Sequence, residues 1–271
     1  MIAVDGIILV ISCQKHLPTR LKEINLKENY GNWKVIKVIG DLFLDCNYKL
    51  EGNLMTIKCE DSYLHLFKKV VLSLQYLYEM FDIKEGILRC CDDLEFNENS
   101  LETFLKSSKK YQINSDEYID IDYMGRSLKG SIINHNFVCE PDKSSDDGYI
   151  LTYYKFHPED FDNPLHNIKD VDIAKYQKRP YIPAWIAGPI LYLSNKSCKI
   201  LINQMSNINY NIYHYDNITD SYPYTLEDCA ISFILLSNNI NLIHQNNWYC
   251  DIGDYQTPMH IALHTNKYNK R

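Results

Sequence analysis

A strand–helix–strand pattern across residues 54–90 constrains the fold more than any other part of the sequence. Residues 54–58 and 86–90 are short apolar or β-branched runs, which are typical of buried strands. Between them, apolar side chains recur at steps of three and four residues and predict a helix with one wide apolar face: Leu64, Phe67, Val70, Val71, Leu74, Leu77, Tyr78 and Phe81. Because two strands joined by a crossover helix form a βαβ unit with parallel strands, the sequence indicates an α/β protein.

Further apolar runs extend this pattern on both sides. Residues 7–11 and 33–39 are predicted to be strands of the same largely buried sheet. The aromatic run 149–156, which lies between two polar loops, predicts a strand with alternating faces. Residues 180–194 and 226–244 are apolar again and are expected to rejoin the core. Because no internal repeat or long linker divides the chain, we expect one domain over residues 1–271.

Residues with capping side chains mark the starts of three predicted helices. Asp61 or Ser62 is the expected N-cap of the long helix. Asn99, followed by Glu102, predicts a helix over residues 100–106. Residues 224–228 (YTLED) resemble a third helix start, with two acidic side chains where they complement the helix dipole.

The composition is that of a folded globular protein, and it narrows the classes of partner. Hydrophobic residues make up 45% of the 271 residues, and charged residues make up 23%. The net charge of −7 gives no general attraction to nucleic acid or to an anionic membrane. Nine cysteines without a C-x-x-C pair favour reduced thiols. No apolar stretch approaches the roughly 18 residues of a spanning helix and none has a signal-peptide leader, so we expect a soluble cytoplasmic protein without a membrane span.

Two adjacent carboxylates, Asp92 and Asp93, follow closely on the strand predicted over residues 86–90. Open α/β sheets bind ligands at the carboxyl ends of their parallel strands, and carboxylate oxygens suit a hard divalent cation. A metal ion at this edge would neutralise the charge of a diphosphate leaving group. The pattern therefore favours a metal-assisted site for a diphosphate compound, with a capped turn at the strand end as the alternative.

Four segments, in order, resemble the motifs of glycosyltransferase family 31, the β-1,3-galactosyltransferase and Fringe group. Residues 61–69 (DSYLHLFKK) resemble its D-S-Y-x-N-L-T-x-K helix start, and residues 89–97 (RCCDDLEFN) resemble its K-x-D-D-D-x-F-x-N strand end. Residues 181–194 (YIPAWIAGPILYLS) resemble Y-P-x-Y-x-x-G-x-G-Y-x-x-S, and residues 227–229 (EDC) resemble E-D-V. The order and spacing together make the combination more specific than any one motif. The chain departs from the family pattern at Phe67, Cys91 and Ile190, where the family has Thr, Asp and Gly.

The resemblance implies a GT-A-type nucleotide-sugar transferase fold, with a twisted mixed sheet flanked by helices. It also implies metal-dependent, inverting transfer of a hexose or N-acetylhexosamine from a UDP-sugar to a hydroxyl of a glycan or glycoprotein, with a β-1,3-type linkage. Family members normally sit behind a membrane anchor in the Golgi. The sequence shows no such anchor, so the chain resembles a cytosolic relative of the kind that large DNA viruses encode.

The resemblance further assigns roles to individual residues. It implies a Mn²⁺ or Mg²⁺ ion held by Asp93 and by a histidine near the C-terminus, either His264 in the sequence IALH or His260. Asp228 is the expected base for the acceptor hydroxyl. The other positions implied to bind or shape the donor nucleotide are Asp61, Lys69, Arg89, Asp92, Gly188 and Glu227.

Two other functions are compatible with the same residues. One is a metal-dependent hydrolase of nucleotide sugars or diphosphates, which would release free sugar without any acceptor. The other is a non-catalytic, sugar-nucleotide-binding or lectin-like protein on the same fold, which the changes at Cys91 and Ile190 favour.

Overall fold

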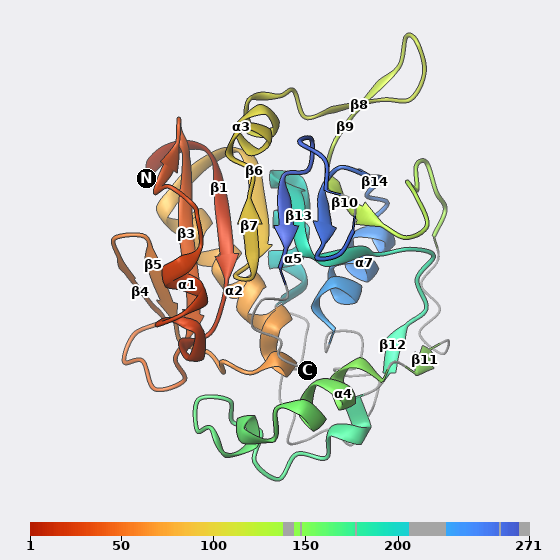
Figure 1. The fold of residues 1–271 in the computed structure, drawn as a ribbon. Coiled ribbons are helices and arrows are strands. Elements are labelled where there is room, and N and C mark those ends of the chain that lie inside the picture. The colour runs from red at the N-terminus through yellow and green to blue at the C-terminus, as the bar shows by residue number, and fades with distance from the viewer. Residues whose placement is uncertain (138–143, 147, 177, 206–225, 255, 266–271) are drawn as a thin grey trace.

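A mixed β-sheet runs through the centre of the molecule (Figure 1). The computed structural model describes residues 1–137, 144–146, 148–176, 178–205, 226–254 and 256–265. In this part of the chain the sheet has nine strands, and its spatial order is β14 (Leu242–His244), β10 (Tyr123–Ser127), β13 (Ile186–Ser194), β6 (Phe81–Cys91), β1 (Ile2–Ile11), β3 (Trp33–Gly40), β5 (Leu54–Ile57) and β4 (Tyr48–Glu51), with β2 (Asn29–Tyr30) beside β3. The strands β6, β1, β3 and β5 are consecutive parallel neighbours, whereas β13 runs antiparallel between β6 and β10. A mixed α/β fold is therefore confirmed.

The predicted βαβ unit is present as β5, α2 (Leu66–Met80) and β6. Its two strands are parallel, with β1 and β3 between them in the sheet. Ser62 is the cap, because its side chain accepts a hydrogen bond from the backbone N–H of His65 in the short 3-10 helix η2 (Tyr63–His65). The helix ends one residue earlier than the apolar spacing predicts, since Phe81 already belongs to β6.

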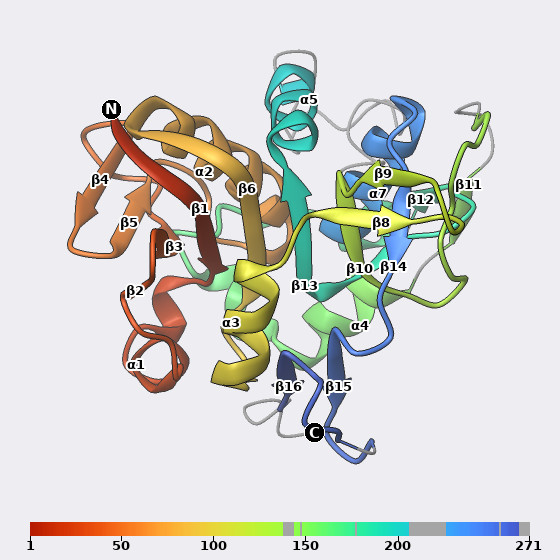
Figure 2. The same ribbon diagram turned by 90° about the horizontal axis from the view of Figure 1, so that it is seen from above.

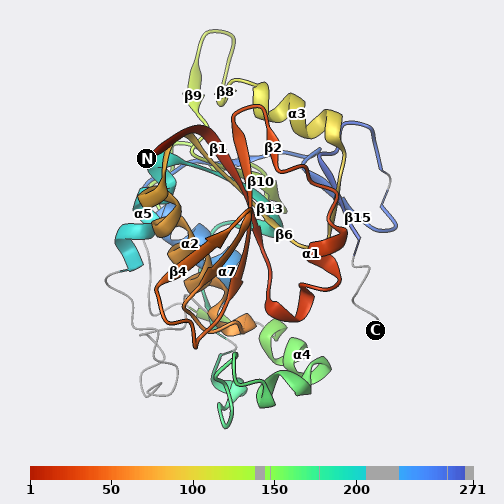
Figure 3. The ribbon, with the colours of Figure 1, turned by 90° about the vertical axis from the view of Figure 1, so that its left-hand side faces the viewer.

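Both faces of the sheet are covered (Figures 2 and 3). The helices α2, α5 (Asn195–Met205) and α7 (Glu227–Ser237) lie on one face. The other face carries α1 (Arg20–Glu23), α3 (Glu98–Lys106) and a small sheet of β15 (Tyr249–Asp251), β16 (Ala262–His264) and β7 (Leu94–Phe96). Strand β1 shows why two layers are needed: Ile7 and Leu9 are buried in one core, and Ile8 and Val10 are buried in the other.

The prediction of a strand over residues 149–156 was wrong, because this segment is the helix α4 (Tyr149–Phe156). Tyrosine, isoleucine and threonine favour strands, but the two buried side chains of the segment, Ile150 and Tyr154, are four residues apart and so share one helix face. They pack with Leu64 and Ile168 in a third apolar cluster. Tertiary burial at helical spacing therefore outweighs strand propensity here. Helix α4 lies beyond the carboxyl ends of the central strands (Figures 1 and 3).

The starts of the other two predicted helices are also shifted. Helix α3 begins at Glu98 and is capped by Asn97, whose side chain accepts from the N–H of Ser100, so Asn99 is inside the helix. Helix α7 begins at Glu227 after Leu226, while Tyr224 and Thr225 lie outside the described residues. The apolar residues of 186–194 and 226–244 form β13, α7 and β14 and rejoin the core as expected.

The remaining described elements are short: η1 (Gln14–His16), β8 (Lys110–Gln112), β9 (Tyr118–Asp120), β11 (Ser144–Asp146), η3 (Pro158–Asp162), η4 (Ile173–Tyr176) and β12 (Lys178–Pro180). Within the described ranges, every helix is too short or too polar to cross a membrane.

Candidate functional site

Asp93 lies at the carboxyl end of β6, where the main sheet meets the small one. Its backbone carbonyl accepts hydrogen bonds from the N–H and Oγ1 of Thr265, at 3.1 and 3.0 Å. Its Oδ2 lies 3.3 Å from Nε2 of His264. Its Oδ1 is buried and has no hydrogen-bond partner among the described residues. A buried carboxylate oxygen without a partner is costly unless a ligand satisfies it, so this atom points to a cation site.

His264 reaches Asp93 from β16 and is held from its other side by Asp251 of β15. Nδ1 of His264 lies 2.8 Å from Oδ1 of Asp251. Burial alone would lower the pKa of His264, but hydrogen bonds and charges from Asp93 and Asp251 outweigh it and raise the pKa. The other candidate histidine, His260, instead lies at Thr257, whose N–H is 3.0 Å from His260 Nδ1. Of the two predicted ligands, the structure therefore places His264 beside Asp93.

The residue types at this edge fit a Mn²⁺ or Mg²⁺ ion, because a carboxylate oxygen and an imidazole nitrogen lie 3.3 Å apart. Among the described residues, no group of three or more His, Cys, Asp or Glu side chains is arranged to hold a metal ion by itself. An ion held by Asp93 and His264 would therefore take its other ligands from substrate and water, as Mg²⁺ usually does at phosphate sites.

Asp92 contacts the segment after β1 and shares Arg20 with Asp93, whose Oδ2 lies 3.7 Å from NH1 of that arginine. Its Oδ2 accepts from the Ser12 hydroxyl and lies 2.7 Å from Nδ1 of His16, while Arg20 lies 3.3 Å from Oδ1. Burial would raise the pKa of Asp92, but the hydrogen bond and charge of His16, with Ser12 and Arg20, lower it. The same contact raises the pKa of His16 to about 9 against the effect of burial, with Cys13 contributing. Asp92 therefore ties the loop after β1 to the end of β6.

Asp61 and Lys69 form a buried ion pair. Asp61 also accepts from the backbone N–H groups of Gly40 and Gln14, at 2.8 and 2.7 Å. Lys69 also donates to the carbonyl of Ser12 at 2.8 Å. Burial would lower the pKa of Lys69, but the charge of Asp61 outweighs it and raises the pKa. The pair therefore holds the ends of β1 and β3 against α2 through these hydrogen bonds.

A second buried ion pair joins β6 to the start of α7. Nε of Arg89 lies 3.0 Å from Oε1 of Glu227, and both side chains are almost completely buried. Arg89 also donates to the carbonyl of Gly188 in β13. Burial raises the pKa of Glu227, Arg89 opposes the shift and Asp228 adds to it, with a result of about 7. Three elements therefore meet at one guanidinium group.

Asp228 follows Glu227 in the first turn of α7 and is half-buried. Its Oδ1 accepts from the N–H of Cys229 at 2.8 Å. Burial raises the pKa of this carboxyl, and hydrogen bonds and the charge of Arg89 oppose the shift only in part. A Cβ atom at Gly188 would lie 3.7 Å from Oδ2 of Asp228, an ordinary van der Waals contact, so Gly188 borders this oxygen.

Two tyrosines lie near the acidic residues: Tyr63 comes from η2 and Tyr149 from α4. The ring of Tyr63 stacks on Tyr153 at 4.4 Å between centroids and meets Tyr149 at 5.9 Å. Burial is the main cause that raises the pKa of Tyr63, and electrostatic interactions with Tyr149 and Asp228 add to the shift. Burial also raises the pKa of Tyr149, and the charges of Asp228 and Asp93 add to the shift. These effects place both phenols within electrostatic reach of the acidic residues, where an aromatic face suits an amphipathic ligand such as a sugar ring.

The nine residues predicted from the sequence therefore gather at the carboxyl edge of the sheet, in three groups: Asp93 with His264, Asp92 with the Asp61–Lys69 pair, and Arg89 with Gly188, Glu227 and Asp228. Cys91 belongs to the third group, because its Sγ lies 3.3 Å from NH1 of Arg89 and 3.6 Å from the carbonyl oxygen of Gly188. The change at Ile190 has a packing explanation: its side chain is fully buried within the sheet core, and Trp248 donates to its carbonyl at 2.7 Å.

Residues 12–20 faintly resemble the S-x(n)-R entry of glycosyltransferase family 31, but the sequence assigned no role to several residues of this edge: Ser12, His16, Arg20, Tyr63, Tyr149, Arg126 and Asp251. The first three follow β1, a parallel neighbour of β6, so the rule that selected Asp92 could also have selected them. No sequence pattern marks Arg126 or Asp251.

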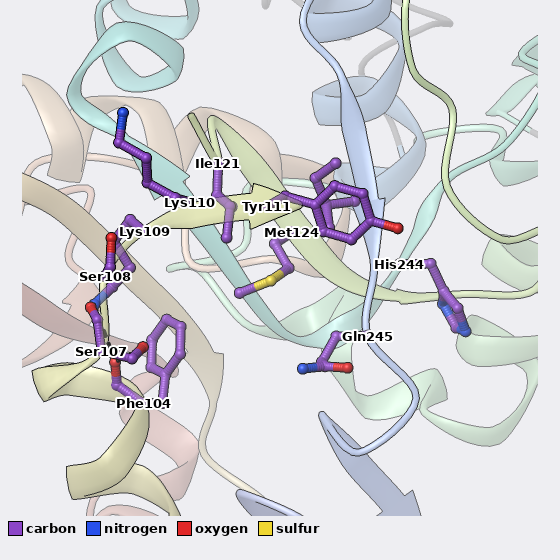
Figure 4. Close-up of a pocket in the computed structure, with 11 residues that line it drawn as sticks. Phe104, Ser107, Ser108, Lys109, Lys110, Tyr111, Ile121, Met124, His244 and Gln245 are labelled. Carbon is purple, nitrogen blue, oxygen red and sulfur yellow. Dashed lines mark hydrogen bonds between the residues drawn. The ribbon is translucent and has the colours of Figure 1, made fainter. Parts of the chain in front are cut away.

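A cavity of about 220 Å³ lies elsewhere, between α3, β8, β10 and the end of β14 (Figure 4). Phe104, Lys109, Met124 and His244 are among its lining residues, and none of the nine predicted site residues is. Lys109 donates into the carbonyl end of α3, to Phe104 and Leu105 at 3.0 and 3.2 Å. The cavity is therefore separate from the carboxyl edge.

Comparison with models of known protein families gives no match, and a search of curated proteins gives none either. The family resemblance therefore stays a prediction.

Proposed function

We propose that this chain is a metal-dependent glycosyltransferase that moves a hexose or N-acetylhexosamine from a UDP-sugar to a hydroxyl of a glycan or glycoprotein. The observation that carries the proposal is the contact of His264 with Oδ2 of Asp93, two residues far apart in sequence, while Oδ1 of the same carboxylate is buried without a hydrogen-bond partner among the described residues. An acidic pair lies near them at the start of α7: Glu227 is buried against Arg89 of β6, and Asp228 is half-buried. A cation site next to a buried carboxylate suits a diphosphate leaving group and a proton acceptor. The motifs favour the GT-A-type version of the α/β fold and a β-1,3-type linkage.

Asp93 and Nε2 of His264 would hold Mn²⁺ or Mg²⁺, and the bound ion supplies positive charge for the diphosphate of departing UDP. Asp228 would accept the acceptor proton. Because its Oδ1 is used by Cys229, we assign the proton to Oδ2, the oxygen in front of Gly188. The acceptor oxygen bonds to the sugar's anomeric carbon, the bond to the diphosphate oxygen breaks, and the configuration inverts. Burial, which raises the Asp228 pKa, brings its basicity closer to the operating pH.

The other predicted residues support this arrangement from inside the protein. Arg89 and Glu227 fix the first turn of α7 and therefore the position of Asp228. The Asp61–Lys69 pair and Asp92 fix the loop after β1, which would form the floor of the nucleotide site. Their polar groups bind one another, so we propose that they shape the nucleotide site more than they contact the nucleotide.

The test measures UDP binding and UDP release for a panel of UDP-sugars, with and without Mn²⁺ and glycan acceptors. Asp93→Ala should lose the tightening of UDP binding by Mn²⁺. Asp228→Asn should keep that tightening and lose about 10²–10⁴-fold in transfer rate. Asp82→Ala is the matched control, because Asp82 is an exposed aspartate at the opposite end of β6.

Three results would contradict the proposal. If Mn²⁺ still tightens UDP binding in Asp93→Ala, Asp93 does not hold the cation. Release of free sugar at a rate independent of acceptor would identify a hydrolase. Metal-stimulated UDP binding without turnover on any acceptor would identify a non-catalytic binding protein.

A further inference from the structure

The small sheet places an aspartate directly beside the histidine of the candidate cation site. Strands β15 and β16 are parallel, and their register pairs Asp251 with His264. Strand β16 in turn pairs antiparallel with β7, which places His264 opposite Leu94, the residue after Asp93. The small sheet therefore aligns Asp251, His264 and Asp93 across three adjacent chain segments.

The contacts use the two imidazole nitrogens for different purposes. Nδ1 of His264 is 2.8 Å from Oδ1 of Asp251, while Nε2 is 3.3 Å from Oδ2 of Asp93. An ionised carboxylate has no proton to donate and can only accept, so the short contact to Asp251 places a proton on Nδ1. When the ring is neutral, this leaves the lone pair at Nε2, on the side of Asp93, where a bound cation can take it. When the ring is protonated, Nε2 instead donates to Asp93. A carboxylate behind the distal nitrogen is a common means of orienting a metal-binding histidine.

Asp251 is itself held by Arg126, at the carboxyl end of β10 in the main sheet. NH1 of Arg126 lies 3.1 Å from Oδ2 of Asp251, the carboxylate oxygen that His264 does not use. The guanidinium group lies over the ring of Tyr249, 5.0 Å from its centroid, and 3.6 Å from Asp254. The ring and the two carboxylates restrict the orientation of Arg126, and the guanidinium fixes the plane of the Asp251 carboxylate.

We propose that Asp251, oriented by Arg126, is a positioning residue that selects the tautomer of His264 and directs Nε2 toward the cation site. The inference rests on the proposed function, because it assigns a purpose to His264 only if a cation binds there. Asp251 touches neither Asp93 nor the reacting groups, and it acts through His264.

Two measurements on the purified full chain test this role. The first is the factor by which Mn²⁺ tightens UDP binding. This factor should fall by about 10–100-fold in Asp251→Ala and by less in Asp251→Asn, whose amide oxygen can still accept from Nδ1. Binding of UDP without metal should not change. Asp82→Ala is the matched control, since Asp82 is an exposed aspartate at the opposite end of β6.

The second measurement is the tautomer of His264, read from the ¹⁵N shifts of its ring without metal and assigned with His264→Gln. In the wild type, the neutral ring should carry its proton on Nδ1. In Asp251→Ala, the tautomer with the proton on Nε2 should become more populated. The side chain of Asp251 is 41% exposed, so we expect both variants to fold, and urea unfolding checks this. An unchanged tautomer and an unchanged Mn²⁺ factor in Asp251→Ala would overturn the inference. A wild type whose UDP binding ignores Mn²⁺ would overturn the proposed function itself.

Discussion

The buried pair of Arg89 and Glu227 makes a quantitative prediction about stability and pH. Burial raises the pKa of Glu227 to about 7, even though Arg89 lies 3.0 Å away and opposes the shift. The unfolded chain should titrate near the ordinary glutamate pKa of about 4.3. The folded protein therefore holds the Glu227 proton more tightly than the unfolded chain does. It follows that Glu227 lowers the free energy of unfolding progressively as the pH rises from about 4.3 to about 7.

Glu227→Gln should remove this pH dependence, because the amide has nearly the shape of the protonated acid. A difference of nearly three pKa units corresponds to about 3–4 kcal/mol in total. Between about pH 5 and about pH 8.5, the free energy of unfolding of the variant should rise relative to the wild type by about 2–3 kcal/mol. The side chain of Glu227 is almost completely buried, so solvent screening should reduce this value little.

Urea unfolding at the two pH values, followed by the fluorescence of the three tryptophans, measures the difference. Glu51→Gln, the same chemical change at an exposed position of β4, is the reference. A stability difference that does not change with pH would refute the raised pKa. If the variant instead loses stability relative to the wild type as the pH rises, Arg89 keeps Glu227 ionised in the folded protein.

Two further predictions concern the other charged groups of the carboxyl edge. Lys69→Met should lower the free energy of unfolding by about 3–5 kcal/mol, because it leaves Asp61 as a buried charge without its cation, and urea unfolding near neutral pH measures this. His16→Gln should cost about 2–3 kcal/mol near pH 6 and almost nothing above about pH 9.5. The raised pKa of His16, about 9, means that its contribution is complete below about 6.5 and is lost as the pH rises through 9. An equal cost of His16→Gln at both pH values would contradict the pairing with Asp92.

The parts of the fold that were predictable are those in which one local pattern repeats over many residues. The apolar face of α2 extends over four turns, and no strand assignment can bury that spacing on one side. The position of Asp92 and Asp93 followed from parallel strands alone, because their carboxyl ends share one edge. Helix α4 could not be predicted in this way, because its eight residues contain only one pair of buried side chains at helical spacing.

The contacts around His264 could not be predicted for a different reason. Strands β15 and β16 have three residues each, and nothing within three residues determines which partner a strand will take. Their register, which places Asp251 beside His264, depends on β7 and on the contact of Asp251 with Arg126 of the main sheet. Tertiary pairing of this kind leaves no periodic signal in the sequence.

Hydrogen bonding separates the carboxylates of this edge more clearly than their sequence positions do. Asp61 and Asp92 have both oxygens engaged by donors from the protein, so each holds its own part of the fold together. Asp93 differs, since its Oδ1 is buried without a partner in the described part of the chain. Such an atom destabilises the folded protein unless something binds it, whereas a fully engaged carboxylate would have to break existing contacts to bind a cation. For this reason Asp93, and not its neighbour Asp92, is the residue at which removal of the side chain should abolish the effect of Mn²⁺.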